Sequence, residues 1–380
     1  MKKTIPYGHQ WIDGSDIASV VRVLKGDWIT QGPAVEQFEQ AIARYCGVKY
    51  AVAFSSGTTA LHAAYAAAGI GSGDEVITTP MTFAATANAI VYCGGKPVFA
   101  DIQEDTLNIS PEEIKKKITK RTKALAPVDF AGHPVELDKI RKIAKERGLL
   151  VIEDAAHALG SEYKGKKVGS FSDMTMFSFH PVKAITTGEG GMIVTNRKDL
   201  YERLKAFRNH GITKKSEKGA WYYEIEKPGN NYRICDLQCA LGLSQFKKLD
   251  RFVKRRREIV RQYNLAFRNV PEITLPVEKS YAKSAYHIYP IRLRLELLKV
   301  GRREIFEALR KKGLGVQVHY IPVHLHPFYT KTFGYKKGDF PVAERYYERA
   351  MTLPLFPKMT SGEIHTVIKT VREVISRYRI

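Results

Sequence analysis

One lysine of this chain occupies a place where it could attack a bound carbonyl group. Lys183 follows the segment Phe177-Ser178-Phe179-His180-Pro181-Val182 and precedes the glycine-rich stretch of residues 188–191. Apolar flanks and a glycine-rich turn favour a tightly packed loop, where burial lowers the pKa of an amine and makes it a nucleophile and a proton carrier. The ordinary alternative for a loop lysine is a solvated surface charge.

A second group of polar residues follows another apolar run. Glu153 and Asp154 come directly after Leu149-Leu150-Val151-Ile152, and His157 follows three positions later. A carboxylate there could pair with a protonated ring nitrogen and keep the ring cationic, so that the ring accepts electrons. Asp154 could equally be the cap of a helix.

The third group consists of small and hydroxyl residues, Ser55-Ser56-Gly57-Thr58-Thr59. Small residues let the backbone approach a ligand, and the free N–H groups of a helix that begins there would attract an anion. The sequence is neither a Walker motif nor a GxGxxG motif. The segment is either a phosphate cup or a plain helix cap, and its sequence alone does not decide between these two interpretations.

The elements that would position these groups alternate along the first 210 residues. Strand-like runs occupy residues 50–54, 75–78, 97–101, 123–128, 149–153, 174–179 and 191–195, and helical patterns occupy residues 15–25, 58–68, 83–92 and 137–147. This alternation predicts an α/β fold, a mostly parallel sheet flanked by helices. The three groups would then meet at the carboxyl edge of the sheet, where such folds bind ligands.

The pattern changes after about residue 233. We expect a long helical stretch to about residue 267, then one or two strands, at residues 288–295 and 316–319, and a last helix over residues 361–378. This indicates a smaller C-terminal α+β domain, which divides the chain into residues 1–245 and residues 246–380.

Composition limits the possible functions. Of 380 residues, 44% are hydrophobic and 26% charged, as in globular proteins, and no apolar run resembles a signal peptide or a membrane span, so we expect a cytoplasmic protein without a membrane partner. The four cysteines are expected to be reduced thiols: Cys46, Cys93, Cys235 and Cys239.

The net charge of +22 raises the question of nucleic acid. Basic residues are spread along the chain among acids, and we interpret the densest run, Lys254-Arg255-Arg256-Arg257, as a solvated helix face. We therefore predict no nucleic-acid partner, and the positive field could instead attract a diphosphate-bearing substrate.

The three groups, in this order and spacing, resemble the fold-type I pyridoxal 5′-phosphate (PLP) enzymes, and more narrowly the DegT/DnrJ/EryC1/StrS family of sugar aminotransferases. The resemblance covers nearly the whole chain and also includes Gly73-Asp74-Glu75-Val76, Pro80-Met81-Thr82-Phe83, His210-Gly211-Ile212, Asn231-Tyr232-Arg233 and Leu241-Gly242-Leu243-Ser244-Gln245. It implies a PLP-dependent transaminase. Some family members carry histidine in place of the lysine and are dehydratases, so Lys183 favours transamination.

The resemblance also implies roles for single residues. Lys183 would form the Schiff base and carry the proton, and Asp154 would bind the pyridine nitrogen. The other cofactor contacts would be His157 beside the ring, Phe83 on its face, Gly57, Thr58 and Ser178 at the phosphate, and Asn231 from a neighbouring subunit, which implies a homodimer with shared sites. The predicted substrate contacts are Tyr7, Thr30, Gln31, His180, Arg233, His319 and Tyr320.

Several stretches further resemble the family members that act in pseudaminic acid biosynthesis, among them residues 208–213, 221–224 and 318–325. This implies transfer from glutamate to C4 of a UDP-linked 4-keto-6-deoxy-N-acetylhexosamine. Gly57 departs from the alanine typical of that group but keeps the backbone donors. A related enzyme acting at C3 or on a dTDP-sugar stays open, as does, more remotely, a non-catalytic DNA-binding regulator. His319, His324 and His326 fit no zinc spacing, so we predict no metal.

Overall fold

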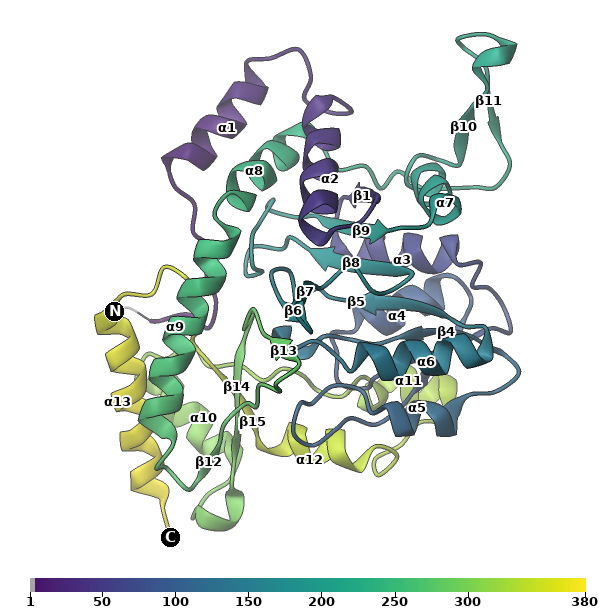
Figure 1. Cartoon of the computed structure of the whole chain (residues 1–380). Helices are drawn as coiled ribbons and strands as arrows, with labels where there is room; N and C mark the ends of the chain where they lie inside the picture. The colour runs from purple at the N-terminus through teal and green to yellow at the C-terminus, as the bar shows by residue number, and fades with distance from the viewer. Residues whose placement is uncertain (1–3) are drawn as a thin grey trace.

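A seven-stranded sheet forms the centre of the computed structural model, which describes residues 4–380 (Figure 1). The strand order is β1-β9-β8-β5-β4-β2-β3; β9 is antiparallel to both of its neighbours, and the other pairs are parallel. The strands are β1 (Tyr50–Phe54), β2 (Glu75–Thr78), β3 (Lys96–Phe99), β4 (Thr122–Ala126), β5 (Leu150–Asp154), β8 (Met174–Ser178) and β9 (Gly191–Thr195). The expected α/β fold with a mostly parallel sheet is confirmed.

Helices cover both faces of this sheet because successive strand residues point to opposite sides. Val52 and Phe54 of β1 pack with α3 and α7, whereas Ala51 and Ala53 pack with α2 on the other face. The helices of this region are α1 (Gly14–Leu24), α2 (Pro33–Cys46), α3 (Gly57–Ala67), α4 (Ala85–Tyr92), α5 (Pro111–Lys117), α6 (Leu137–Arg147), α7 (Lys198–Arg208) and α8 (Asp236–Phe246).

The C-terminal part builds a separate hydrophobic cluster around a small antiparallel sheet. The sheet order is β12-β14-β15, and helices α9, α10 and α13 supply much of the cluster. Ile5 from the start of the chain also packs into this cluster. Its elements are α9 (Leu249–Phe267), β12 (Ile273–Thr274), β14 (Tyr289–Leu293), α10 (Arg302–Lys311), α11 (Pro327–Phe333), α12 (Pro341–Arg349), β15 (Ala350–Leu353) and α13 (Ser361–Tyr378). A smaller α+β part is thus present, and the division at residue 245 stays a prediction.

Two short β structures complete the fold. One is a three-stranded sheet of order β13-β6-β7, made of β6 (Glu162–Tyr163), β7 (Lys166–Lys167) and β13 (Ala282–Lys283). The other is a hairpin of β10 (Ile212–Lys214) and β11 (Tyr223–Ile225), which extends away from the rest of the chain (Figure 1).

Two expectations about the C-terminal half are wrong. The long helical stretch is broken between Phe246 and Leu249, because α8 packs on α1 and α2 while α9 turns to bury its apolar face against α13. Lys248 at the break forms ion pairs with Asp13 and Asp16. Residues 316–319 make one bridge, between Gln317 and Thr352, rather than a strand, and β15 takes the place beside β14.

The interpretation of the basic run on α9 is wrong for one of its members. Lys254 is exposed, but Arg256 is 1% exposed and donates hydrogen bonds to the carbonyl oxygens of His287 and Leu355. Burial lowers the pKa of Arg256 to about 10. Four consecutive residues extend around more of a helix than its exposed face, so one of these four charged residues lies on the buried side. Backbone carbonyl groups then accept hydrogen bonds from that buried charge.

All four cysteines are free thiols, with Cys46 and Cys239 buried. No helix within residues 4–380 combines the length and the apolar character that crossing a membrane requires.

Candidate functional site

A cavity of about 430 Å³ opens at the carboxyl edge of the sheet. It is bounded by the segments that follow β1, β5 and β8, as expected for ligand sites in open α/β sheets. Eleven of the predicted site residues line it: Tyr7, Gly57, Thr58, Phe83, Asp154, His157, Ser178, His180, Lys183, His319 and Tyr320. The fold therefore brings the three polar groups of the sequence to one place.

Lys183 is held by a loop that backbone hydrogen bonds fix at both ends. The Lys183 N–H donates to the carbonyl of His180, and the Thr187 N–H donates to that of Phe179. Gly190 must lack a side chain, since a Cβ there would lie 2.2 Å from Oγ1 of Thr187. The pKa of Lys183 is lowered from 10.5 to about 8 because burial disfavours the ammonium, and Asp154 offsets part of this effect. The amine is therefore partly neutral near physiological pH.

Asp154 ends β5 with its carboxylate in the cavity wall. Oγ1 of Thr86 donates to Oδ2 at 2.6 Å, and the N–H of Ala156 donates to Oδ1 at 3.1 Å. Burial raises the pKa of Asp154, and the two hydrogen bonds together with Lys183 act against that rise. The carboxylate is thus fixed in orientation and has its charge supported by two donors.

A second pair of carboxyl groups lies beside Asp154 but does not face the cavity. Asp129 and Glu153 are fully buried, and burial raises the pKa of both. Oε2 of Glu153 accepts from Ser172 and Thr175. Neither Asp129 nor Glu153 lines the cavity, so Asp154 is the member of this group of three that faces it.

The segment after β1 is a helix cap whose remaining N–H groups could also hold an anion. Oγ of Ser56 accepts from the N–H of Thr59, and Oγ1 of Thr59 accepts from the N–H of Ser56. Within residues 4–380 this leaves the N–H groups of Gly57 and Thr58 without a protein acceptor. A Cβ at Gly57 would lie 3.1 Å from Cβ of Ser178, so glycine keeps the backbone and the hydroxyl of Ser178 close together. The helix cap is thus present, and the role of this segment at a phosphate stays a prediction.

His157 and Tyr320 form a hydrogen-bonded pair across the cavity. Nδ1 of His157 accepts from the N–H of Ala131, and Nε2 lies 3.0 Å from the hydroxyl of Tyr320. Burial lowers the pKa of His157 well below its ordinary value, so the ring is neutral. A neutral ring that accepts at Nδ1 carries its proton on Nε2 and donates it to Tyr320. The hydroxyl proton of Tyr320 is then available to an acceptor in the cavity.

His319 and Tyr7 line a side of the cavity that is formed by segments outside the seven-stranded sheet. Their rings are tilted with centroids 5.3 Å apart, and Nδ1 of His319 lies 2.9 Å from the hydroxyl of Thr352. The pKa of His319 is lowered to about 4 by burial and by Lys183, so this ring is also neutral.

Four predicted residues do not line the cavity of their own chain: Thr30, Gln31, Asn231 and Arg233. Asn231 is exposed and bridges to Asn209, which also accepts a hydrogen bond from Arg233. Thr30 bridges to Cys235, so it lies near the same segment. Their roles stay predictions.

Eleven lining residues were not among the predicted site residues, and they include Leu61, Thr86, Glu189 and His287. Thr86 carried a signal, because it is a polar residue three positions after Phe83 in a mostly apolar helical pattern. His287 carried none, since it reaches the cavity from a segment 130 residues after His157; its ring is tilted against that of His157, with centroids 4.4 Å apart.

Metal ligation was considered for the histidines after residue 318. Across residues 4–380, no three or more histidine, cysteine or acidic side chains are grouped so as to hold a metal ion. Nε2 of His324 instead lies 2.9 Å from Oε1 of Glu344.

The cavity fits a phosphorylated pyridine aldehyde. Gly57, Thr58 and Ser178 offer donors for a phosphate, Asp154 offers a charge for a ring nitrogen, and Lys183 offers an amine of lowered pKa. A lysine paired with an acidic partner for the pyridinium nitrogen is the arrangement by which proteins hold PLP.

The lowered pKa of Lys183 predicts how the cofactor-free protein reacts with PLP. Only the neutral amine attacks a carbonyl, so the rate of condensation should rise about tenfold per pH unit at low pH. The rise should level off above the Lys183 pKa of about 8. Absorbance after mixing at fixed ionic strength measures this rate. A rate still rising tenfold per unit at pH 10 would show an ordinary, solvated lysine.

Comparisons with known proteins agree with this geometry. Residues 10–372 match the DegT/DnrJ/EryC1/StrS aminotransferase family. The spore coat polysaccharide biosynthesis protein SpsC of Bacillus subtilis is 44% identical over 98% of this chain and 97% of its own length. The UDP-4-amino-4,6-dideoxy-N-acetyl-beta-L-altrosamine transaminase of Campylobacter jejuni is 42% identical over 99% of this chain and 98% of its own length.

A solved structure extends the likeness to three dimensions. PseC of Helicobacter pylori, described as an aminotransferase involved in the biosynthesis of pseudoaminic acid, superposes with a TM-score of 0.94 at 36% identity, covering 99% of this chain and 100% of that one. With a family match over almost the full length and a cavity suited to PLP, the chain belongs to the DegT/DnrJ/EryC1/StrS aminotransferase family and uses pyridoxal 5′-phosphate as its cofactor.

Proposed function

We propose that this protein transfers an amino group from glutamate to C4 of a UDP-linked 4-keto-6-deoxy-N-acetylhexosamine. The observation that carries the proposal is the amine of Lys183, with its lowered pKa, in one cavity with Asp154 and the donors of Gly57 and Thr58. The sugar is suggested by the relatives from Campylobacter jejuni and Helicobacter pylori and by the sequence stretches that resemble the pseudaminic acid branch.

Bound PLP supplies an electron-accepting ring, and the residues of this chain supply proton transfer and orientation. The neutral amine of Lys183 can take a proton from the α-carbon of glutamate and later return one to the sugar carbon. Asp154 keeps the ring nitrogen protonated, which strengthens the ring as an electron acceptor. Tyr320, which receives the Nε2 proton of His157, can donate its hydroxyl proton to an oxygen on the ring.

The substrate can be tested with purified holoenzyme and a panel of keto-sugars. We expect glutamate-dependent amination of the UDP-linked 4-keto-6-deoxy-N-acetylhexosamine, with kcat/KM at least about tenfold above that of the dTDP-linked or 3-keto analogues, since polar contacts discriminate by that factor or more. Mass spectrometry of the product gives the added amine, and NMR gives its position. Preferred amination at C3, or of a dTDP-sugar, would move the assignment to the alternative branch. SpsC, at 44% identity, is described as a spore coat polysaccharide biosynthesis protein, which keeps that branch open.

We also propose that two copies assemble with shared active sites. Ile17, Val21 and Leu24 lie on one face of α1 and are 59%, 40% and 58% exposed, and Trp28 beyond the helix is 60% exposed. An exposed apolar face of this kind marks a protein interface. Thr30, Gln31, Asn231 and Arg233 do not line the cavity of their own chain, so in this proposal they contact the cavity of the partner.

Shared sites predict complementation between two inactive variants. In a mixed dimer of Lys183→Ala and Asn231→Ala subunits, one site combines the intact Lys183 with the intact Asn231 of the other subunit, and the second site lacks both. Co-expressed, doubly tagged dimers should therefore regain about half of the wild-type activity, whereas each homodimer stays low. No recovery in mixed dimers would mean that Asn231 serves its own subunit or none.

We propose the cytoplasm as the location of the protein. The four free cysteines fit a reducing compartment. Retention of free thiols in protein isolated under alkylating conditions would support this placement, and disulfides in such a sample would contradict it.

A further inference from the structure

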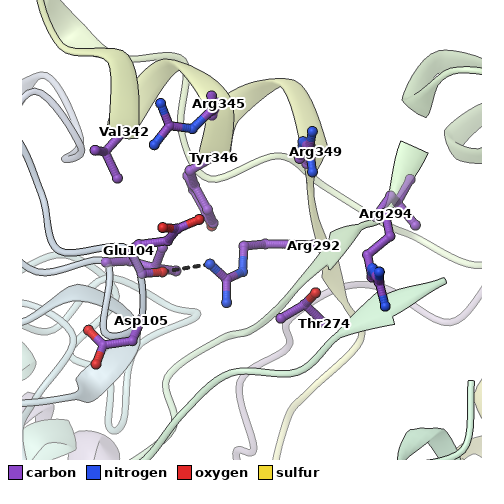
Figure 2. A pocket seen from close by; sticks show the side chains of 11 residues that line it. Glu104, Asp105, Thr274, Arg292, Arg294, Val342, Arg345, Tyr346 and Arg349 are labelled. Carbon is purple, nitrogen blue, oxygen red and sulfur yellow. Dashed lines mark hydrogen bonds between the residues drawn. The ribbon is translucent and has the colours of Figure 1, made fainter. Parts of the chain in front are cut away.

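A second cavity, of about 540 Å³, lies apart from the active site and shares no lining residue with it. Four arginines surround it: Arg292 on β14, Arg294 just after it, and Arg345 and Arg349 on α12. The opposite wall is the loop after β3, with Glu104 and Asp105 (Figure 2). The cavity therefore lies between the C-terminal sheet and helix and a loop of the large sheet.

The arginines are only partly neutralised. Arg294 and Arg349 share one carboxylate, Glu296, at 3.4 and 3.3 Å. In the part of the chain that the structure describes, Arg292 and Arg345 form no ion pair.

The acidic wall does not cancel the remaining charge. Asp105 is paired with Lys279, so that Glu104 is the only other carboxylate among the lining residues. Four guanidinium groups thus face two available carboxylates, those of Glu104 and Glu296, and two positive charges remain.

Arg292 reaches across the cavity. It is half-buried, and one of its N–H groups donates to the backbone carbonyl of Glu104 across the cavity (Figure 2). Burial lowers the pKa of Arg292. The guanidinium has five N–H donors and uses one of them on this carbonyl. It therefore keeps a pair of donors that can bind an anion.

The walls between the charges are apolar and rigid. Leu107, Leu293 and Val342 line the cavity, and the buried ring of Tyr346 closes it. The hydroxyl of Tyr346 is occupied, since it donates to the carbonyl oxygen of His319 at 2.9 Å. Because His319 belongs to the active-site wall, Tyr346 separates the two cavities.

We propose that this arginine cavity, defined by Arg292, Arg294, Arg345 and Arg349, binds a phosphate-type dianion such as a diphosphate group. Arginine forks match phosphate oxygens in pairs, and the two uncompensated charges match a dianion. The volume exceeds that of a lone phosphate and suits a diphosphate or a nucleoside diphosphate, which carry the same chemistry. A bound dianion would join β14 and α12 to the loop after β3 and so stabilise the fold.

The test uses PLP-loaded enzyme with pyrophosphate and, separately, UDP, each compared with sodium chloride at equal ionic strength. We expect pyrophosphate to raise the melting temperature by about 2 °C at saturating concentration. In the Arg345→Gln/Arg349→Gln variant, calorimetric affinity for pyrophosphate should fall at least tenfold. Glutamine keeps helix propensity, so α12 should persist.

The matched control is Arg303→Gln/Arg372→Gln, which removes the same charge from exposed positions on α10 and α13. This control should bind pyrophosphate as wild type does. If the affinity for pyrophosphate fell equally in both variants, net charge alone would explain the effect. If it fell in neither variant, the anion would bind elsewhere, for instance at the active site. Equal binding of malonate would overturn the phosphate preference. Stronger binding of UDP than of pyrophosphate, lost in the α12 variant, would identify a nucleotide as the source of the diphosphate.

Discussion

Replacing Lys183 with alanine is expected to lower amino-group transfer by more than about a thousandfold, because it removes both the nucleophile and the proton carrier. The release of 2-oxoglutarate from glutamate in a single turnover measures this loss without depending on which sugar is the acceptor. Borohydride reduction followed by peptide mass analysis should place the cofactor mass on Lys183 in wild type and on no peptide of the variant.

Lys183→Arg is the control for charge. It keeps a cation of similar length but not an amine whose pKa can fall to about 8, so it should be as inactive as the alanine variant. If either variant retained more than about a tenth of the wild-type rate, or if another lysine carried the label, the assignment of this site would be wrong.

Replacing Asp154 with asparagine is expected to lower the rate by about a hundredfold to a thousandfold, the usual effect of removing one fixed electrostatic partner. The amide has the same shape but no charge to hold the ring nitrogen protonated. It also removes a charge that raises the pKa of Lys183, so the pH midpoint for condensation with PLP should move below about 8. The measurements are single-turnover rate and the pH profile of the cofactor-free protein.

Thr86→Val is the matched control for Asp154. It removes the 2.6 Å hydrogen bond to Oδ2 but leaves the charge, so it should cost about tenfold or less and keep the condensation midpoint near that of wild type. A rate for Asp154→Asn within threefold of wild type, or a midpoint that moves upward, would contradict the role of this carboxylate.

The strands and the chemistry of the site could be predicted from the sequence because both depend on residues that are close together in the chain. β2, β9, α6 and α13 begin and end at the expected residues, since apolar periodicity and turn residues mark such elements. Lys183, Asp154 and the Gly57–Thr58 segment each follow a strand, and the carboxyl ends of strands in such a sheet lie along one edge. Their convergence therefore followed from the order of elements.

Other features depend on packing between distant segments. The break between α8 and α9 arises because the two helices serve different cores, and the charge of Arg256 is buried because carbonyls from far along the chain satisfy it. Thr86 became a partner of Asp154 only through the approach of α4 to β5.

By itself, the sequence determined which residue types stand at the ends of the strands, and so the kind of chemistry available to the protein. Tertiary structure decided the protonation of such groups: burial brings Lys183 to a pKa of about 8, makes His157 and His319 neutral, and raises the pKa of Asp129 and Glu153. The physical reason is that periodicity is a property of neighbours along the chain, whereas desolvation depends on every segment that packs around a group.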